Sequence, residues 1–239
     1  MDERNYRALL PHILGSRGRA DITVTGYSMN PLIHEGDTVT LVTSDSYEVG
    51  DVLVFSYYPD RLTVHRLLKK DGMYHCKGDN TFRLESVTAD KVLGRVTLIN
   101  GEPIRPWPEW KIRLSYAQYL EFHQLGDSIP EAKKTDLWRF YSRFILERED
   151  NNMLYRKNTD FDYIETDETS LAVFDPESGD THFFNETGMD ILKCIDEPCD
   201  LETLLCRLCE IYEATPDDIR EDVIEFMADA VTKKVVIIK

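Results

Sequence analysis

The sequence predicts an α+β protein with a mostly antiparallel β domain, a helical connector, and a C-terminal module of strands followed by three helices. Three observations support this order. Apolar and polar residues alternate through residues 20–99, apolar residues take a helical spacing from about Glu109 to Glu149, and strand patterns return over residues 155–185 before three helical segments. We therefore expect two domains, at residues 1–105 and 151–239, joined by a helical connector at residues 106–150.

The first domain begins with a short helix-like segment and continues with runs that alternate as β-strands do, with turn residues between them. The runs are ITVTG, DTVTLVT, GDVLVFSYY, LTVHRLL, MYHCKGDN and KVLGRVTLI. The next segment, NGEPIRPWPEW, contains three prolines, so we expect no strand to continue through it.

The connector has an amphipathic helix. One broad face collects Leu137, Trp138, Phe140, Tyr141, Phe144 and Ile145. Basic residues lie nearby, so one interpretation is a helix on a membrane surface. We favour a helix packed on a neighbouring domain, because most amphipathic helices are half buried in their own protein.

The C-terminal module starts with strands, and LAVFDPESGDTHFFN reads as a hairpin turned by Asp-Pro-Glu-Ser-Gly. Three helices follow. The first is capped by Asn185 or Thr187, the second by Asp200, and the third by Thr215, with Pro216 at its first position. Strands followed by three helices predict a winged-helix-like module.

Charge is spread unevenly along the chain, whose formal net charge is -16. Residues 151–239 hold 8 Lys and Arg against 22 Asp and Glu, a net of -14, whereas residues 1–150 hold 20 against 22. This argues against nucleic acid as a partner. The N-terminal residues contain no long apolar stretch, and an odd number of cysteines (five) indicates reduced thiols, so we expect a cytoplasmic protein without a membrane span.

The segment GYSMNPLI, residues 26–33, raises the question of a nucleophilic serine. Gly26 permits a sharp turn and Pro31 biases Asn30 toward an extended conformation, so Ser28 is expected at the mouth of a sheet. A serine hydroxyl needs a neighbouring base to become a nucleophile. Taken alone, Ser28 is equally explained as a turn serine that bonds to local backbone.

Five motifs strengthen the nucleophile interpretation. GYSMNPLIHEGD, VGDVLVF, VHRLL, KGDN and KVLGRV resemble, in order and spacing, signal peptidase I and its LexA-type relatives over residues 22–99. The resemblance implies that Ser28 is the nucleophile and His65 the general base. Bacterial signal peptidases carry Lys-Arg where this sequence has His65-Arg66, whereas the endoplasmic-reticulum and archaeal type carries His-Arg. An imidazole base suits neutral pH without the desolvation that a lysine base requires.

The same resemblance offers two candidates for the acid that orients the base. In the His-type enzymes an acid follows the Gly-Asp of the KGDN motif by six residues, which is Glu85 here, while Asp79 is the Gly-Asp acid itself. Asp79 is equally explained by a tight Gly-Asp-Asn turn. His34 and His75 are the competing histidines; we expect His34 to be solvated and His75 to lie on a strand beside the site.

One position departs from the pattern. Many signal peptidases place Ser or Thr two residues before the nucleophile to donate to the oxyanion, and this sequence has Gly26 there. The backbone N–H of Ser28 must then donate instead, and the loss of one donor costs roughly 3 kcal/mol.

The segment LAVFDPESGDTHFFNETGMDILKCID and the acidic helical run after it resemble PqqD over residues 154–237. That family consists of small winged-helix domains that bind leader peptides of ribosomally made, modified peptides. The resemblance implies that an extended leader lies along the third strand and against the last helix. The peptide-binding residues would be Thr181, His182, Phe183, Phe184, Asp222, Glu225, Phe226 and Asp229. One of the paired phenylalanines must be core, because adjacent strand residues face opposite ways.

Four cysteines in this module raise a metal hypothesis, since four thiolates can hold zinc or an iron–sulfur cluster. They are Cys194, Cys199, Cys206 and Cys209. Cys206 and Cys209 lie among leucines on a helix, where cysteine usually acts as a small buried apolar residue. We therefore expect no metal and no cofactor.

These features predict a serine endopeptidase that recognises a leader-bearing precursor through its C-terminal domain and cuts it during maturation of a modified peptide. The expected partners are the leader peptide and a peptide-modifying enzyme. One alternative is an inactive peptidase-fold scaffold that binds the leader and recruits modifying enzymes. A LexA-like DNA-binding regulator is disfavoured, because its recognition helix would read PDDIREDVIEFMADA, which phosphates repel.

Overall fold

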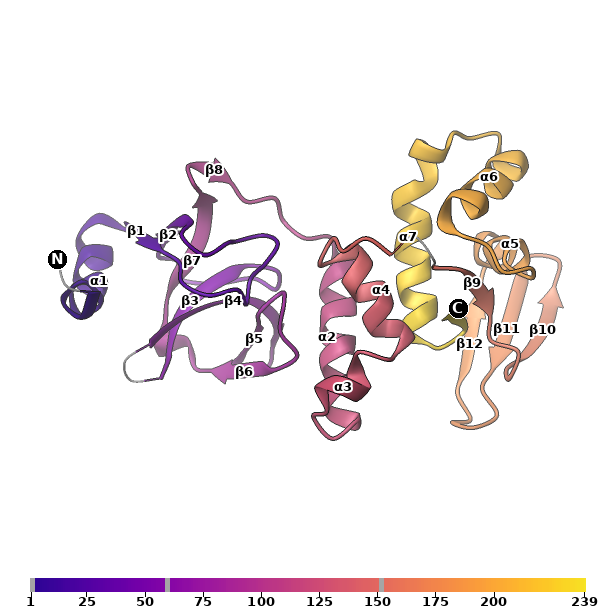
Figure 1. Cartoon of the computed structure of the whole chain (residues 1–239), viewed down its shortest axis with the longest axis horizontal. Helices are drawn as coiled ribbons and strands as arrows, with labels where there is room; N and C mark the ends of the chain where they lie inside the picture. The colour runs from indigo at the N-terminus through magenta and orange to yellow at the C-terminus, as the bar shows by residue number, and fades with distance from the viewer. Residues whose placement is uncertain (1–2, 59–60, 151–152) are drawn as a thin grey trace. The chain divides into compact units, whose positions relative to one another are not determined.

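The computed structural model describes residues 3–58, 61–150 and 153–239, with side chains given from Leu10 onward except at Tyr58 (Figure 1). The chain divides into two compact units. The first runs to Ala132 and includes Phe144–Glu147, and the second comprises Lys133–Arg143 and Arg148–Lys239. The expected connector, residues 106–150, is divided between these two units.

The first unit is built on one antiparallel sheet with the strand order β1-β2-β7-β3-β4-β5-β6, and β8 pairs with β7. The strands are β1 (Arg19–Thr23), β2 (Thr38–Val42), β3 (Val52–Tyr58), β4 (Arg61–Lys70), β5 (Tyr74–Lys77), β6 (Leu84–Val87), β7 (Val92–Ile99) and β8 (Glu102–Pro103). All six predicted strands are present. The sequence analysis missed β6 and β8, because four and two residues carry too little alternation.

Strand β3 forms the centre of this unit. Val52 and Val54 belong to one buried cluster and Leu53 and Phe55 to another, so both faces of the strand are covered. The helices of the unit are α1 (Glu3–Arg17), a 3₁₀ turn at Ala89–Lys91, α2 (Glu109–Gln124) and α3 (Ile129–Ala132). Two layers of packing on one sheet give a rigid support for the turns at its ends.

The second unit contains two small sheets. The strands are β9 (Tyr155–Lys157) paired with β13 (Val236–Ile238), and β10 (Asp162–Asp167), β11 (Ser170–Phe174) and β12 (Thr181–Phe184) in that order. The helices are α4 (Asp136–Phe144), α5 (Glu186–Cys194), α6 (Leu201–Tyr212) and α7 (Pro216–Thr232). The predicted hairpin between β11 and β12 is confirmed, and β13 was not predicted.

The predicted helix caps of this unit are also confirmed. The side chain of Asn185 accepts from the N–H of Gly188, and that of Asp200 accepts from the N–H of Thr203. At the start of α7 the N–H of Thr215 donates to the carboxylate of Asp218, as in a capping box.

Helix α4 packs against the small β9–β13 sheet. The Phe140 ring lies 6.3 Å from that of Tyr155, and the Arg139 guanidinium donates to the carbonyls of Ile238 and Lys239. Leu137, Trp138, Phe140 and Tyr141 are buried. These contacts favour the packed helix over one that lies on a membrane surface. Among the described residues, we find no helix with the length and apolar character to span a membrane.

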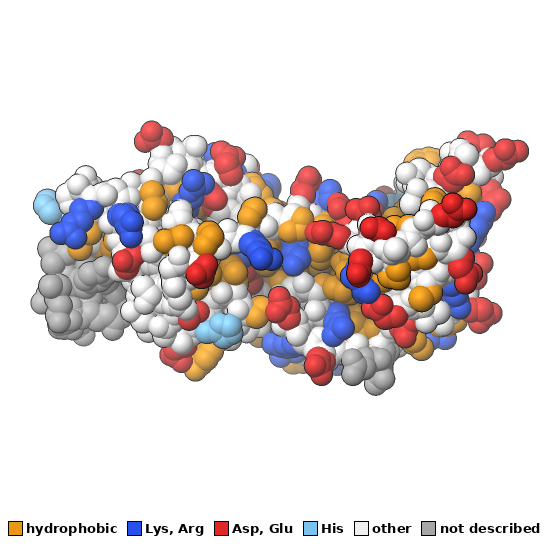
Figure 2. All heavy atoms as spheres, turned by 90° about the horizontal axis from the view of Figure 1, so that it is seen from above, with side chains coloured by type: hydrophobic (Ala, Val, Ile, Leu, Met, Phe, Trp, Pro, Cys, Tyr) orange, Lys and Arg blue, Asp and Glu red, His pale blue; other side chains and the backbone are white. Residues whose placement is uncertain are grey.

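Acidic side chains are frequent on the surface of the second unit (Figure 2). The described part of residues 151–239 contributes most of the net negative charge of the chain, as the sequence analysis indicates.

Candidate active site

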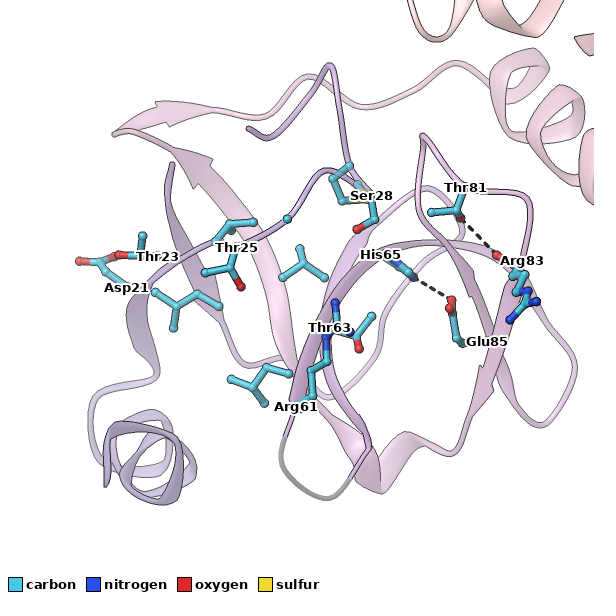
Figure 3. Close-up of a pocket in the computed structure, with 16 residues that line it drawn as sticks. Asp21, Thr23, Thr25, Ser28, Arg61, Thr63, His65, Thr81, Arg83 and Glu85 are labelled. Carbon is cyan, nitrogen blue, oxygen red and sulfur yellow. Dashed lines mark hydrogen bonds and ion pairs between the residues drawn. The ribbon is translucent and has the colours of Figure 1, made fainter. Parts of the chain in front are cut away.

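A cleft of about 790 Å³ lies at one end of the first sheet. Its walls come from β1 and the turn that follows it, from the first five residues of β4, and from residues 81–85. Ser28, His65 and Glu85 all line this cleft, from three different parts of the chain (Figure 3). The structure thus brings together three of the four predicted catalytic residues in one open space.

Ser28 sits in a turn that the sheet holds at both ends. Gly26 has φ +95°, a left-handed conformation that glycine adopts without strain. Met29, directly after the serine, is buried in the core. From the KGDN motif, the N–H of Asn80 donates to the carbonyl of Ser28 at 2.8 Å, and its side chain donates to the carbonyl of Tyr27. Ser28 itself stays half-buried on the cleft wall.

His65 is held by Glu85 and the surrounding strands. Its Nδ1 lies 2.7 Å from Oε2 of Glu85, and only 5 % of the histidine is exposed. Strand β4 pairs with β5, and β5 with β6, which brings Glu85 within reach and accommodates its extra methylene. With Nδ1–H donating to the carboxylate, Nε2 keeps the lone pair that a general base needs.

Gly78 brings the serine turn against the imidazole. A Cβ at this position would lie 2.6 Å from the carbonyl oxygen of Ser28 and 2.8 Å from Nε2 of His65. Only glycine fits there, so the Gly78 backbone is wedged against both groups. In Figure 3 the Ser28 hydroxyl lies on the side of the turn that faces His65. Among the contacts of the described residues there is no Ser28–His65 hydrogen bond, a bond that in catalytic sites often tightens only when substrate binds.

The turn also offers a donor for an oxyanion. The N–H of Ser28 donates to no acceptor among the described residues, and Gly26 lines the cleft without a side chain. A backbone N–H next to the nucleophile is the kind of group that stabilises the developing charge in acyl transfer.

Asp79 occupies a different place from the one proposed for a catalytic acid. Its carboxylate binds Arg66 in a bidentate pair, with Nε–Oδ1 at 3.0 Å and Nη2–Oδ2 at 2.7 Å, and both residues are almost fully buried. Arg66 also donates to the carbonyl of Gly50 and stacks 3.7 Å from the centre of the Trp107 ring. The expectation of Asp79 in the cleft is corrected, because His65 and Arg66 project to opposite faces of β4.

The competing histidines stay outside the cleft. His34 is exposed, as expected, whereas His75 is bound by Asp71 at 2.6 Å and by Ser86 at 2.8 Å. His75 lies on strand β5, as expected, opposite Ser86, the neighbour of Glu85, but it does not line the cleft.

A buried lysine near the site was missed by the sequence analysis. Lys77 is fully buried, and its Nζ donates to Oγ of Ser115 on α2 at 3.2 Å. Burial lowers the pKa of Lys77 to about 7, against the opposing effect of Asp79 and Glu85. The sequence feature that could have indicated a buried Lys77 is its place next to Cys76, in a short strand that leads into the Gly-Asp turn.

The predicted peptide-binding residues form a second candidate site in the other unit. Among the described residues, strand β12 pairs with β11 alone, so its outer edge is open. The Phe184 ring lies 5.7 Å from that of Phe226, so this edge and the face of α7 are neighbours. Phe184 is buried and Phe183 is 74 % exposed, which confirms that only one of the pair is core.

The remaining residues of this site differ in their exposure and charge. Thr181 and Asp222 are exposed, whereas His182, Glu225 and Asp229 are partly covered. Asp229 forms an ion pair with Lys233 at 2.5 Å, so its charge is already offset.

The cysteines correct one expectation. Cys206 is exposed and Cys209 only half-buried, because both lie off the face on which α6 buries its leucines. The part of the chain that the structure describes contains no group of three or more His, Cys, Asp or Glu side chains placed to hold a metal ion.

Comparison with known families separates the two units. Residues 6–97 match the family described as Peptidase S24-like, and residues 170–236 match Coenzyme PQQ synthesis protein D (PqqD). The chain thus pairs a segment similar to the peptidase-like family with a segment similar to PqqD. A comparison with curated proteins gave no match. The pair of domains fits a role in peptide processing or leader-peptide binding, and the Ser28 cleft lies within the residues matched by the peptidase-like family.

Proposed function

We propose that this protein is a serine endopeptidase that cuts a leader-bearing precursor in the maturation of a ribosomally made, modified peptide. One observation carries the proposal. His65 is bonded to Glu85 through Nδ1, and its Nε2 lies against the Gly78 backbone, on which the Ser28 turn also packs. A nucleophile, a base and an orienting acid in one cleft are the parts that acyl transfer needs.

The acylation step follows from these positions. His65 Nε2 takes the proton of the Ser28 hydroxyl as Oγ attacks the scissile carbonyl carbon. The oxyanion that forms accepts a hydrogen bond from the N–H of Ser28, and Glu85 stabilises the imidazolium. The imidazolium then gives its proton to the leaving amine, and the peptide bond breaks to leave an acyl-enzyme on Ser28.

Deacylation uses the same groups. His65 takes a proton from water, which attacks the ester carbonyl, and the proton returns to Oγ as the acid product leaves. These steps regenerate the free enzyme, and none of them uses a cofactor.

The cleft suits an extended substrate. Residues Arg61–His65 pair with β3 on one side, and β4 pairs with β5 only from Arg66 onward. In the part of the chain that the structure describes, strand β1 pairs with β2 alone. Two open strand edges thus border the cleft, and an extended peptide can form backbone hydrogen bonds along either one.

The PqqD domain supplies recognition in this proposal. A leader strand along the open edge of β12, beside Phe226 on α7, would hold the precursor to the enzyme and raise the local concentration of the scissile segment. A modifying enzyme is a further expected partner, since leader-binding domains of this family serve peptide modification.

Cleavage by matched variants tests the proposal. Mass spectrometry of a precursor incubated with Ser28→Ala or His65→Ala should show cleavage reduced at least about a thousandfold, while His34→Ala, an exposed histidine outside the cleft, cuts normally. The double variant should lose no more than either single variant, because the pair acts as a unit. Unchanged cleavage by Ser28→Ala would remove Ser28 as the nucleophile.

A second candidate function is an inactive scaffold that binds the leader. It is favoured by Gly26, which offers no side-chain donor, and by the lack of a Ser28–His65 hydrogen bond among the described contacts. Binding of a leader without cleavage by the wild-type chain would support this scaffold over the peptidase.

A further inference from the structure

The β10-β11-β12 sheet has two apolar faces. Leu171, Val173 and Phe184 are buried on the face that meets the helices. On the opposite face the register aligns Ile164 with Ala172 and Ala172 with Phe183, one residue from each strand. Phe174 lies on that same face, two residues along β11. We name the four residues Ile164, Ala172, Phe174 and Phe183 the outer-sheet patch.

The two outer residues of the outer-sheet patch are exposed, whereas Ala172 between them is buried and Phe174 is half-buried. Phe183 is 74 % exposed and Ile164 is 55 % exposed. Single exposed apolar residues are ordinary on protein surfaces, but a contiguous set across neighbouring strands indicates a contact surface. Neighbouring strands lie about 4.8 Å apart, so the patch spans roughly 10 Å between Ile164 and Phe183.

The segment of the chain that carries the patch is acidic. Residues 158–192 contain ten Asp or Glu and no Lys or Arg. The two turns that close the sheet carry several of these acids, and Asp167 accepts hydrogen bonds from the backbone and hydroxyl of Thr169, which lower the pKa of its carboxyl. Lys193 on α5 reaches one acid, Glu165, at 3.1 Å. A partner for this face must therefore bring basic groups around an apolar anchor.

We propose that the outer-sheet patch is a docking surface for a basic amphipathic helix of a partner protein. A helix with its side chains is about 10 Å wide, which matches the span of the patch across three strands. A leader strand added at the edge of β12 would touch Phe183 but not Ile164, which lies two strands away. A second copy of the chain would bring the same acidic surface, and like charges would oppose the contact.

The proposal is independent of peptide cleavage. It concerns a face other than the β12 edge and the α7 face, and it holds equally for a peptidase and for a scaffold. The basic helix would belong to a protein that must stay close to the recognition domain.

Binding of a synthetic helix to the full-length protein tests the proposal. The probe is a peptide with leucines on one helical face and lysines on the other, and its affinity is measured by calorimetry. Ile164→Ser combined with Phe183→Ser should weaken binding at least about tenfold, because each change removes an apolar contact. Ile211→Ser is the matched control, an isoleucine 51 % exposed on α6, and should bind as the wild type does.

Further arms separate the possible occupants. A probe with glutamates in place of the lysines should bind at least about tenfold more weakly, and added salt should weaken the lysine probe. Equal binding by the double variant and the wild type would overturn the proposal. Loss of leader binding in Ile164→Ser alone, a change two strands away from the β12 edge, would assign the patch to the leader site. A dimer in sedimentation that the double variant abolishes would assign the patch to a second copy.

Discussion

His65 and Arg66 are consecutive residues of β4 whose side chains have opposite tasks. His65 reaches Glu85 at the cleft, and Arg66 reaches Asp79 in the interior. Alternation along the strand separates the proposed general base from a buried ion pair. The buried Arg66–Asp79 pair also fixes the Gly-Asp turn that carries Gly78, so the neighbouring residue supports the site without facing it.

Replacement of the orienting acid should affect turnover more than binding. Glu85→Gln should lower kcat by roughly a thousandfold with KM little changed, because the imidazole loses its fixed tautomer and the stabilisation of its charged form. Asp71→Asn is the control, since Asp71 contacts His75 and not His65. Steady-state kinetics on a cleaved precursor measure both; equal kcat for Glu85→Gln and wild type would remove the orienting role.

The close approach at Gly78 makes a second prediction. Gly78→Ala should abolish cleavage, because its Cβ would meet the Ser28 carbonyl at 2.6 Å and push the serine turn away from the imidazole. Gly15→Ala on α1 is the matched control, since no atom lies within 4 Å of its Cβ position. Full activity in a folded Gly78→Ala protein would show that the turn need not contact His65.

Lys77 links stability to pH. The pKa of Lys77 is about 7 in the folded protein and 10.5 for a lysine without such burial. Between pH 7 and pH 10.5 the unfolded state therefore binds more protons than the folded state. The free energy of unfolding should therefore rise with pH over this window. Lys77→Met should remove this dependence and stabilise the protein on the order of a few kcal/mol below pH 7, with a smaller gain near pH 10.

Urea unfolding at several pH values measures the effect of Lys77. Lys91→Met, an exposed lysine beside Asp90, should leave the pH dependence unchanged. If the unfolding free energy of Lys77→Met and of the wild type changed equally with pH, Lys77 would not be neutral in the folded state above pH 7.

Among the secondary-structure elements, helix α4 marks the start of the second unit. It lies before the matched residues 170–236, yet its buried face covers the β9–β13 sheet and Arg139 holds the last two carbonyls of the chain. The fold unit is thus longer than the family match. The buried residues of α4 pack within the second unit, against the β9–β13 sheet, and not on a membrane surface.

Truncation of one α4 side chain tests this boundary. Phe140→Ala should lower the unfolding free energy of the second unit by about 3–5 kcal/mol, because Phe140 is fully buried against Tyr155. Phe183→Ala, at an exposed ring, should change it little. Hydrogen exchange resolved by residue would locate the loss; protection unchanged throughout β9 and β13 would contradict the packing.

At the level of the whole molecule, the proposed function assigns cleavage to the first unit and leader recognition to the PqqD-like segment. If the PqqD domain tethers the substrate, the first unit truncated after Ala132 should cut a short peptide across the scissile bond with kcat little changed. Cleavage of full precursor at low concentration should fall by one to several orders of magnitude, because tethering supplies an effective concentration on the order of millimolar.

Three controls complete the truncation experiment. Circular dichroism checks that the truncated unit is folded, and residues 133–239 added as a separate chain should not restore cleavage, since a detached domain holds the leader away from the cleft. Equal loss on short and full substrates would mean that the PqqD domain also shapes the active site. No loss on either would exclude substrate delivery as its purpose.

Local sequence patterns predict the strand runs, the hairpin between β11 and β12, and the caps at Asn185, Asp200 and Thr215, because these depend on neighbours only a few residues away. Motif order was also enough to propose Ser28, His65 and Glu85. The long-range contacts of the fold show that Glu85 contacts His65 while Asp79 binds Arg66, that α4 belongs to the second unit, and that Lys77 is buried. These outcomes depend on which strand face and which helix meet across long separations in the chain, and alternation within one segment carries no information about its partner.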